Sequence, residues 1–285
     1  MTSNEGQPDN PSNPPGGGSP GGGVGGWVDG AWLSLGTLSV LPARVPSTVD
    51  RPVGGRAMVL APVVGLVIGS VAAGVVGLVQ LVRPDADLLS AVLAVLVVAG
   101  LSGALHLDGM ADFADALGSR RDRETMLRIM KQSDIGPFGV VSIIGVLLVD
   151  VAALTTCIQA GFGWQAALIA TTASRLTLPW SCRTTIPAAR PDGLGAVVAA
   201  TVRPLTAAAT TVVVLAAALA LTWLTTSPDL LQLAGTAAAV LLAVATAGAT
   251  TRHAHTTLGG TTGDVLGAAI ELALPIAFLT LALTA

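Results

Sequence analysis

The chain has 285 residues, of which 52% are apolar and only 11% charged, and its formal net charge is −3. Soluble domains carry roughly a quarter charged residues, so this composition excludes an ordinary water-soluble globular protein. Long uncharged apolar runs, such as 58–82 and 88–105, point to membrane helices. Runs of about 18 or more such residues can cross a bilayer, where only helices satisfy their own backbone hydrogen bonds. The sequence therefore predicts an all-α, polytopic membrane bundle.

In chain order, residues 1–26 are rich in Asn, Pro, Ser and Gly, which predicts a disordered tail that is not a signal peptide. Residues 27–42 form a short apolar stretch interrupted by Asp29, which predicts an interfacial or re-entrant helix, or an eighth span. About seven membrane helices are expected to follow, at 58–82, 88–105, 137–160, 164–182, 205–226, 230–249 and 265–283. Residues 27–285 are thus expected to form a single membrane-embedded domain.

The basic residues predict how this bundle is oriented. Lys and Arg gather in the connections that would lie on one side of the membrane, whereas the opposite connections contain only Arg83. Cytoplasmic loops carry an excess of Lys and Arg. We therefore expect a multi-pass protein of the cell (inner or plasma) membrane, with its chemically active face toward the cytoplasm.

Three aspartates follow the second predicted span. Asp108, Asp112 and Asp115 are spaced i, i+4, i+7, so a helix carries them on one face. Their charges repel one another, and a bound cation removes that penalty. Oxygen ligands suit Mg²⁺ or Mn²⁺, which predicts a Mg²⁺ site with Mn²⁺ as a substitute. The alternative, a solvated acidic face, is disfavoured by the small and apolar neighbours.

A basic segment precedes the third predicted span. Arg128 and Lys131 lie about one helical turn apart, so both can contact one anionic group. Gly136 and Gly139 allow the backbone to approach a ligand closely. These features predict a phosphate-binding segment, although a basic membrane anchor explains the same spacing.

A Gly-Thr-rich turn leads into the last predicted span. Asp264 is expected to cap that helix, and Glu271 lies on the same face two turns later, where an unpaired carboxylate is costly. The free amides of the helix N-terminus suit an anion. We expect phosphate contacts and a second acidic arm of the metal site here. Arg175, which also lies in an apolar segment, is a candidate partner for Glu271, for Asp150 or for a substrate.

Four segments, taken in order, resemble signatures of the cobalamin synthase family. They are HLDGMADFAD at 106–115, MKQSDIGPFG at 130–139, RPDGLG at 190–195 and LGGTTGDVLGAAIE at 258–271. Two positions depart from the family pattern. Ala116 stands where the family often has glycine, and Asp134 stands where it often has a basic residue. The second departure is expected to weaken one phosphate contact, and it bears on the role of Lys131.

The resemblance implies a Mg²⁺-dependent phosphotransferase that acts late in cobalamin biosynthesis. It would join adenosylcobinamide-GDP to α-ribazole, or to its 5′-phosphate, and release GMP. The implied partners are these small molecules and the lipid bilayer, without nucleic acid, and a homo-oligomer stays open. The implied metal ligands are Asp108, Asp112, Asp115, Asp264 and Glu271, and the implied catalytic residues are Asp115, Arg128 and Lys131. The implied substrate contacts are His106, Ser133, Gly136, Gly139, Arg175, Arg190, Gly260, Thr262 and Gly263.

Two other functions account for some of the same features. A phospholipid-type CDP-alcohol phosphotransferase also carries aspartates at cytoplasmic helix ends, but its DGxxAR signature is absent, because Asp108-Gly109 is followed by Met-Ala-Asp. A transporter explains the number of spans and the ionisable residues in apolar segments. Transporters tend to place their polar groups at the bilayer midplane, whereas most carboxylates here gather at one face. Both alternatives are disfavoured.

Overall fold

A computed structural model describes residues 24–285, which form twelve α-helices and, within that range, two isolated β-bridges but no strand. The all-α prediction is confirmed. The predicted tail lies outside the described residues except for 24–26, which already belong to the first helix. The helices are α1 (Val24–Leu38), α2 (Arg51–Val82), α3 (Asp87–Leu101), α4 (Leu105–Gly118), α5 (Arg123–Ile129), α6 (Pro137–Gln159), α7 (Gly163–Arg175), α8 (Thr177–Ser181), α9 (Gly193–Val198), α10 (Pro204–Thr225), α11 (Leu230–Leu258) and α12 (Gly263–Ala282).

Five helices in the described range are long and apolar enough to cross a membrane, namely α2, α6, α10, α11 and α12. A sixth span exists only if α3 and α4 are counted together, and these two meet at 85°. The helix α7 has 13 residues, which extend about 20 Å and fall short of the roughly 30 Å hydrocarbon core. The membrane bundle is confirmed, but the predicted count of seven spans is not.

Two predicted helices are interrupted, and each break has a local cause. The helix expected at 88–105 ends at Leu101, because Gly103 and Ala104 take left-handed backbone angles, with φ of 63° and 55°. The helix expected at 164–182 breaks at Leu176. Pro179 lacks the N–H that would bond the Arg175 carbonyl, and its ring crowds that carbonyl.

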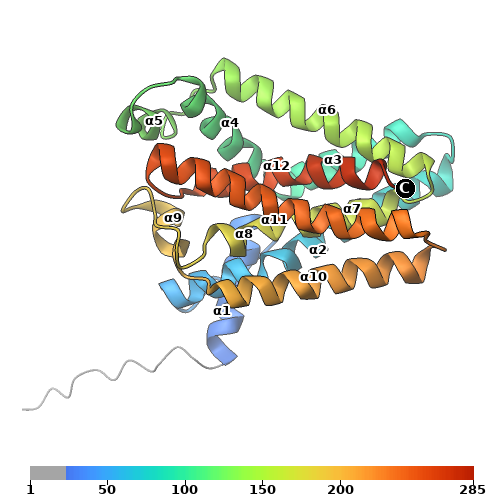
Figure 1. The fold of residues 1–285 in the computed structure, drawn as a ribbon, viewed down its shortest axis with the longest axis horizontal. Coiled ribbons are helices and arrows are strands. Elements are labelled where there is room, and N and C mark those ends of the chain that lie inside the picture. The colour runs from blue at the N-terminus through green and yellow to red at the C-terminus, as the bar shows by residue number, and fades with distance from the viewer. Residues whose placement is uncertain (1–23) are drawn as a thin grey trace, which may run out of the picture.

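The long helices lie side by side, and the short helices α5 and α9 lie at one end of the bundle (Figure 1). That end carries α5, α9 and the turn between α11 and α12, whereas the C-terminus lies at the other end. The helix α1 runs across the bundle direction, and its 15 residues are too few for a full span. It matches the short N-terminal helix predicted at 27–42.

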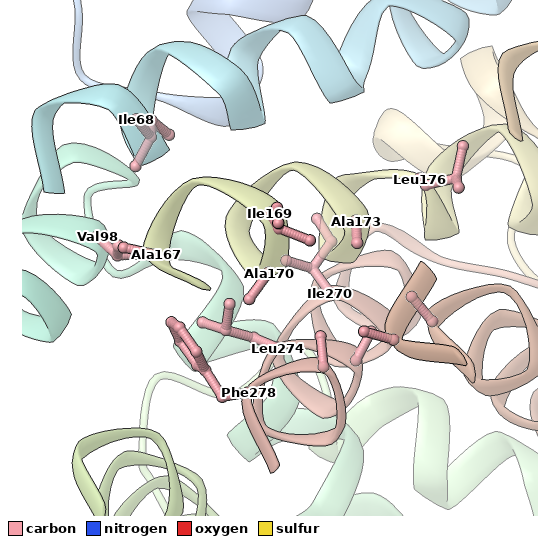
Figure 2. Packing of buried hydrophobic residues seen from close by; sticks show 14 of the residues in the cluster. Ile68, Val98, Ala167, Ile169, Ala170, Ala173, Leu176, Ile270, Leu274 and Phe278 are labelled. Carbon is pink, nitrogen blue, oxygen red and sulfur yellow. The ribbon is translucent and has the colours of Figure 1, made fainter. Parts of the chain in front are cut away.

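The centre of the bundle is α7, which packs between α2 and α12 (Figure 2). Ala167, Ala170 and Ala173 are almost completely buried there, together with Ile270 of α12. On the α2 side the contact depends on glycine, because a Cβ added to Gly65 would lie 2.6 Å from a backbone oxygen of α7. Small residues permit such close helix approach. The helix α7 is therefore a core element and not a lipid-facing span.

Candidate active site at one end of the bundle

Two aspartates of α4, Asp108 and Asp112, lie beside the first turn of α12. A Cβ added to Gly109 would lie 2.9 Å from the Cα of Asp264, and one added to Gly267 would lie 3.1 Å from the Cα of His106. Glycine at both positions is what allows the two helices to cross so closely. The crossing places Asp108 and Asp264 in the lining of one hollow, and Asp112 lies one helical turn after Asp108 on α4, where the charges of Asp108, Asp264 and Asp115 act on it. We call Asp108, Asp112 and Asp264 the carboxylate rim.

Asp264 is held by a cation instead of capping its helix. Arg190 Nη2 donates to Asp264 Oδ2 over 2.7 Å, and both side chains are largely buried. The cap of α12 is Thr262, whose Oγ1 accepts the amide of Val265 at 3.2 Å and donates to Asp264 Oδ2 at 3.2 Å. The expectation that Asp264 caps this helix is therefore wrong, because Thr262 occupies that position.

Backbone pairing joins the segment before Arg190 to the turn before α12. The Ala189 amide donates to the Thr261 oxygen at 2.8 Å, and the Thr261 amide donates to the Pro187 oxygen at 2.9 Å. A Cβ on Gly260 would overlap the Pro187 carbonyl. The absence of a side chain at Gly260 therefore leaves room for this backbone pairing, and the pairing holds Arg190 opposite Asp264.

A polar hollow of about 260 Å³ opens beside this ion pair. It is lined by Lys131 and Arg190, by their partners Asp192 and Asp264, and by the glycine-containing segments 193–195 and 261–263. Lys131 Nζ lies 2.8 Å from Asp192 Oδ2, and this contact lowers the pKa of the Asp192 carboxyl. Two cations beside glycine-rich backbone are suited to a phosphate. We call this space the cationic hollow.

A second hollow of about 310 Å³ continues toward the bundle core. Its lining combines the polar residues Asp108, Asp264 and His106 with apolar residues such as Met58 and Ile270. We call it the inner hollow. Both hollows are lined by Leu194, Gly263 and Asp264, so Asp264 stands where they meet.

Asp115 does not point into either hollow. Its carboxylate accepts the amides of Gly136, at 2.7 Å, and Gly139, at 3.0 Å, at the start of α6. A Cβ at either glycine would lie 2.5 Å from a carboxylate oxygen. A carboxylate is stabilised at a helix N-terminus. Asp115 thus ties α4 to α6, and the two glycines, which we expected at a ligand, make room for Asp115.

Two other predicted contacts lie outside the hollows. Arg128 is exposed and donates to Thr125 Oγ1 at 3.1 Å, and Ser133 is exposed and lines neither hollow. The structure shows a further residue that the sequence did not single out, Arg123, which donates to the carbonyls of Leu258 at 2.6 Å and Ala189 at 2.9 Å. Its partners lie 135 and 66 residues away in sequence, so no local pattern could have identified it.

Four ionisable side chains lie deeper in the bundle, each at most 4% exposed, namely His106, Asp150, Arg175 and Glu271. His106 Nδ1 lies 3.8 Å from Glu271 Oε1. Glu271 and Asp150 both act electrostatically on Arg175, but in the described range neither carboxylate forms a direct ion pair with it. Arg175 therefore has two acidic neighbours, and the sequence alone left the choice between them open.

The five predicted metal ligands do not form one cluster. Three make the carboxylate rim, Asp115 is bound to backbone amides, and Glu271 lies about 10 Å along α12 from Asp264. Across residues 24–285, no three His, Cys, Asp or Glu side chains converge closely enough to hold a metal ion by themselves. A cation at the rim would need further oxygen ligands, such as phosphates.

Comparison with known proteins identifies the family. Residues 30–282 match the model of the cobalamin-5-phosphate synthase family. The chain is 41% identical over 263 residues to an adenosylcobinamide-GDP ribazoletransferase of Frankia casuarinae, covering 87% of this chain and 92% of that protein. It is 37% identical over 241 residues to the protein of the same name from a Nocardioides species, covering 85% and 93%. No solved structure matches. The chain belongs to the cobalamin-5-phosphate synthase family.

Proposed function

We propose that this chain is an adenosylcobinamide-GDP ribazoletransferase. It would transfer adenosylcobinamide phosphate from adenosylcobinamide-GDP to α-ribazole, or to its 5′-phosphate, with release of GMP. The observation that carries the proposal is the junction at Asp264, where a cationic hollow meets an inner hollow edged by carboxylates. One hollow suits a diphosphate, and the other suits the nucleophile and a metal ion. The names of the relatives agree with this chemistry.

In the cationic hollow, Lys131 and Arg190 would hold the diphosphate of adenosylcobinamide-GDP. The Lys131 ammonium and the Arg190 guanidinium both line this space, and each is now paired with an aspartate. Binding of a diphosphate would exchange these carboxylates for phosphoryl oxygens, which are strong charge-assisted acceptors. Amides of 193–195 and of the turn before α12 would add neutral donors. The segment that carries Arg190 and the segment that carries Thr262 both line this hollow, so the backbone hydrogen bonds between them are needed to form it.

The carboxylate rim fits a Mg²⁺ ion that shares its ligands with the substrate. Mg²⁺ is usually held by one or two carboxylates together with substrate phosphates, so the absence of three converging protein ligands in the described range does not disfavour it. Asp108 and Asp112 would be the protein ligands, with Mn²⁺ as a substitute, and Arg190 would orient Asp264. When bound, the ion neutralises charge on the phosphoryl oxygens.

The reaction forms one P–O bond and breaks another. A ribose hydroxyl of α-ribazole attacks the phosphorus that carries the cobinamide, and the bridging P–O bond to GMP breaks. The hydroxyl proton passes to a rim carboxylate, and Lys131 with Arg190 stabilises the departing GMP. Asp115 is assigned a positioning role, because both of its carboxylate oxygens already accept backbone amides.

The site is proposed to face the cytoplasm. The cationic hollow lies at the end of the bundle that carries α5 and α9, where most basic connections lie (Figure 1). This position suits water-soluble substrates that are drawn from the cytoplasm into a membrane-bound enzyme.

The proposal is tested by incubating detergent-solubilised protein with adenosylcobinamide-GDP, α-ribazole and Mg²⁺. Mass spectrometry should detect cobalamin and GMP in equal amounts, and EDTA should abolish both until Mg²⁺ is restored. A parallel reaction with α-ribazole 5′-phosphate should yield cobalamin 5′-phosphate. Folded protein that makes no product from either acceptor would refute the proposal. Uptake of adenosylcobinamide-GDP into sealed vesicles without chemical change would instead indicate a transporter.

A further inference from the structure

Part of the lining of the inner hollow comes from the end of α1. Besides residues of α4 and α12, the hollow is lined by Gly36, Thr37 and Leu38, the last three residues of α1. We call residues 36–38 the α1 end. The four segments that resemble family signatures all lie later in the chain, and none of the predicted substrate contacts falls on α1. The α1 end is thus part of the candidate active site, although the sequence gave it no role.

The α1 end is held beside the start of α4. Just after it, the Val40 amide donates to the oxygen of Leu101, the last residue of α3, at 2.8 Å. A Cβ added to Gly103, in the left-handed break between α3 and α4, would lie 2.8 Å from the Val40 side chain. The first residue of α4, Leu105, lines the inner hollow together with the α1 end. The break between α3 and α4 therefore brings these two segments to the same hollow.

The inner hollow is mostly apolar, and no Lys or Arg is among its lining residues. It therefore suits a diphosphate less well than the cationic hollow does. Its volume is about 310 Å³. A protein cavity of about 150 Å³ can hold benzene, so the inner hollow has room for two fused rings but not for a corrin macrocycle. Its apolar lining residues are Leu38, Met58, Leu105, Leu178, Leu194, Leu266 and Ile270.

The position of the inner hollow suits one part of a nucleoside. It shares Leu194, Gly263 and Asp264 with the cationic hollow, so a ligand in it would border a diphosphate held by Lys131 and Arg190. A nucleoside joins a flat base to a ribose. With the base among the apolar residues, the ribose would lie near Asp264, and its hydroxyl would face the diphosphate.

We propose that the inner hollow binds the base of the acceptor nucleoside and that the α1 end helps to select it. The inference rests on the proposed function. The base of α-ribazole is a dimethylbenzimidazole, a flat bicycle without an amino or carbonyl group. Apolar surroundings favour such a base over a purine, whose exocyclic polar groups would leave water without gaining partners. The hydroxyl of Thr37 is already donated to the Leu33 carbonyl at 2.7 Å, so it does not offer a purine its proton.

The base site is tested by inhibition kinetics of the intact, detergent-solubilised protein with free dimethylbenzimidazole. This base should compete with α-ribazole and not with adenosylcobinamide-GDP, whereas GMP should compete with adenosylcobinamide-GDP. Adenine should inhibit at least about tenfold more weakly than dimethylbenzimidazole. Competition of dimethylbenzimidazole with adenosylcobinamide-GDP, or equal inhibition by adenine, would overturn the proposal.

A substitution at the α1 end tests which residues form the site. Thr37→Phe should fill the hollow and raise KM for α-ribazole at least about tenfold, with KM for adenosylcobinamide-GDP unchanged. The matched control is Thr155→Phe, at a partly buried threonine of α6 that also donates to a carbonyl four residues earlier, at 2.7 Å, and lines neither hollow. If Thr37→Phe does not fold, Leu105→Trp fills the same hollow from a residue that is 54% exposed. An unchanged KM for α-ribazole in a folded filling variant would overturn the proposal.

Binding measured without turnover separates this inference from the proposed function. A ligand of the folded state raises Tm, so dimethylbenzimidazole should stabilise the wild type and Thr155→Phe but not Thr37→Phe. Protein that shows this pattern but forms no cobalamin would refute the proposed function and keep the base site. Protein that forms cobalamin but is not stabilised by saturating dimethylbenzimidazole would refute the base site and keep the proposed function.

Discussion

Substitution of Asp115 by asparagine separates a positioning role from a catalytic one. The carboxylate accepts two amide hydrogen bonds, at 2.7 Å and 3.0 Å. Asparagine keeps one oxygen and turns its NH₂ group toward the other amide, so one hydrogen bond is lost and a buried donor is left without an acceptor. Hydrogen bonds to charged groups contribute about 1.5 to 3 kcal/mol. We therefore expect the free energy of unfolding to fall by about 2 to 3 kcal/mol.

The assay is thermal unfolding of the detergent-solubilised variant, followed by intrinsic fluorescence. For a chain of this size the expected loss lowers Tm by about 4 to 12 °C. Gly139→Ala should behave in the same way, because its Cβ would lie 2.5 Å from Asp115 Oδ2, whereas Gly145→Ala, with open space around it, should not. Asp112→Asn is expected to keep the wild-type Tm. If Asp115→Asn unfolds at the wild-type temperature but loses turnover, the positioning role is refuted and Asp115 belongs to the reacting groups.

Three further predictions follow from the same geometry. Arg190→Ala should raise KM for adenosylcobinamide-GDP and also lower kcat, because the guanidinium holds the diphosphate and stabilises the departing GMP, measured by steady-state release of GMP; an unchanged KM would contradict a phosphate contact. Gly260→Ala should lower Tm because its Cβ would overlap a backbone carbonyl, whereas Gly248→Ala, with open space, should not. Arg175→Met should lower the free energy of unfolding, since it removes the cation whose charge acts on the buried Glu271 and Asp150, and adding Glu271→Gln should recover part of that loss. A double variant no more stable than the single one would contradict the electrostatic coupling.

The sequence predicted what depends on local spacing. The i, i+4, i+7 aspartates do lie on one helix, α4, and the Gly-Thr-rich turn does open onto the N-terminus of α12. Composition was enough to predict the membrane bundle, because long uncharged apolar runs are typical of helices that cross a bilayer and satisfy their own backbone hydrogen bonds there.

The roles of individual side chains depended on contacts between distant segments. Nothing in the sequence around Asp115 reveals that amides 21 and 24 residues later would bind both of its oxygens. The pairing of Arg190 with Asp264 crosses 74 residues and requires the Gly260 turn to be in place. The breaks after α3 and α7 were missed because hydropathy alone does not register a left-handed backbone or a proline.

The central claim, that the carboxylate rim beside the cationic hollow performs the transfer, is tested most directly by turnover of Asp108→Asn. The matched control is Asp85→Asn, an exposed aspartate paired with Arg83 outside the hollows. With saturating substrates and Mg²⁺, the account predicts that Asp108→Asn, while folded, forms cobalamin at least about 100-fold more slowly than the wild type. Asp85→Asn should match the wild type. Wild-type turnover by folded Asp108→Asn would contradict the account.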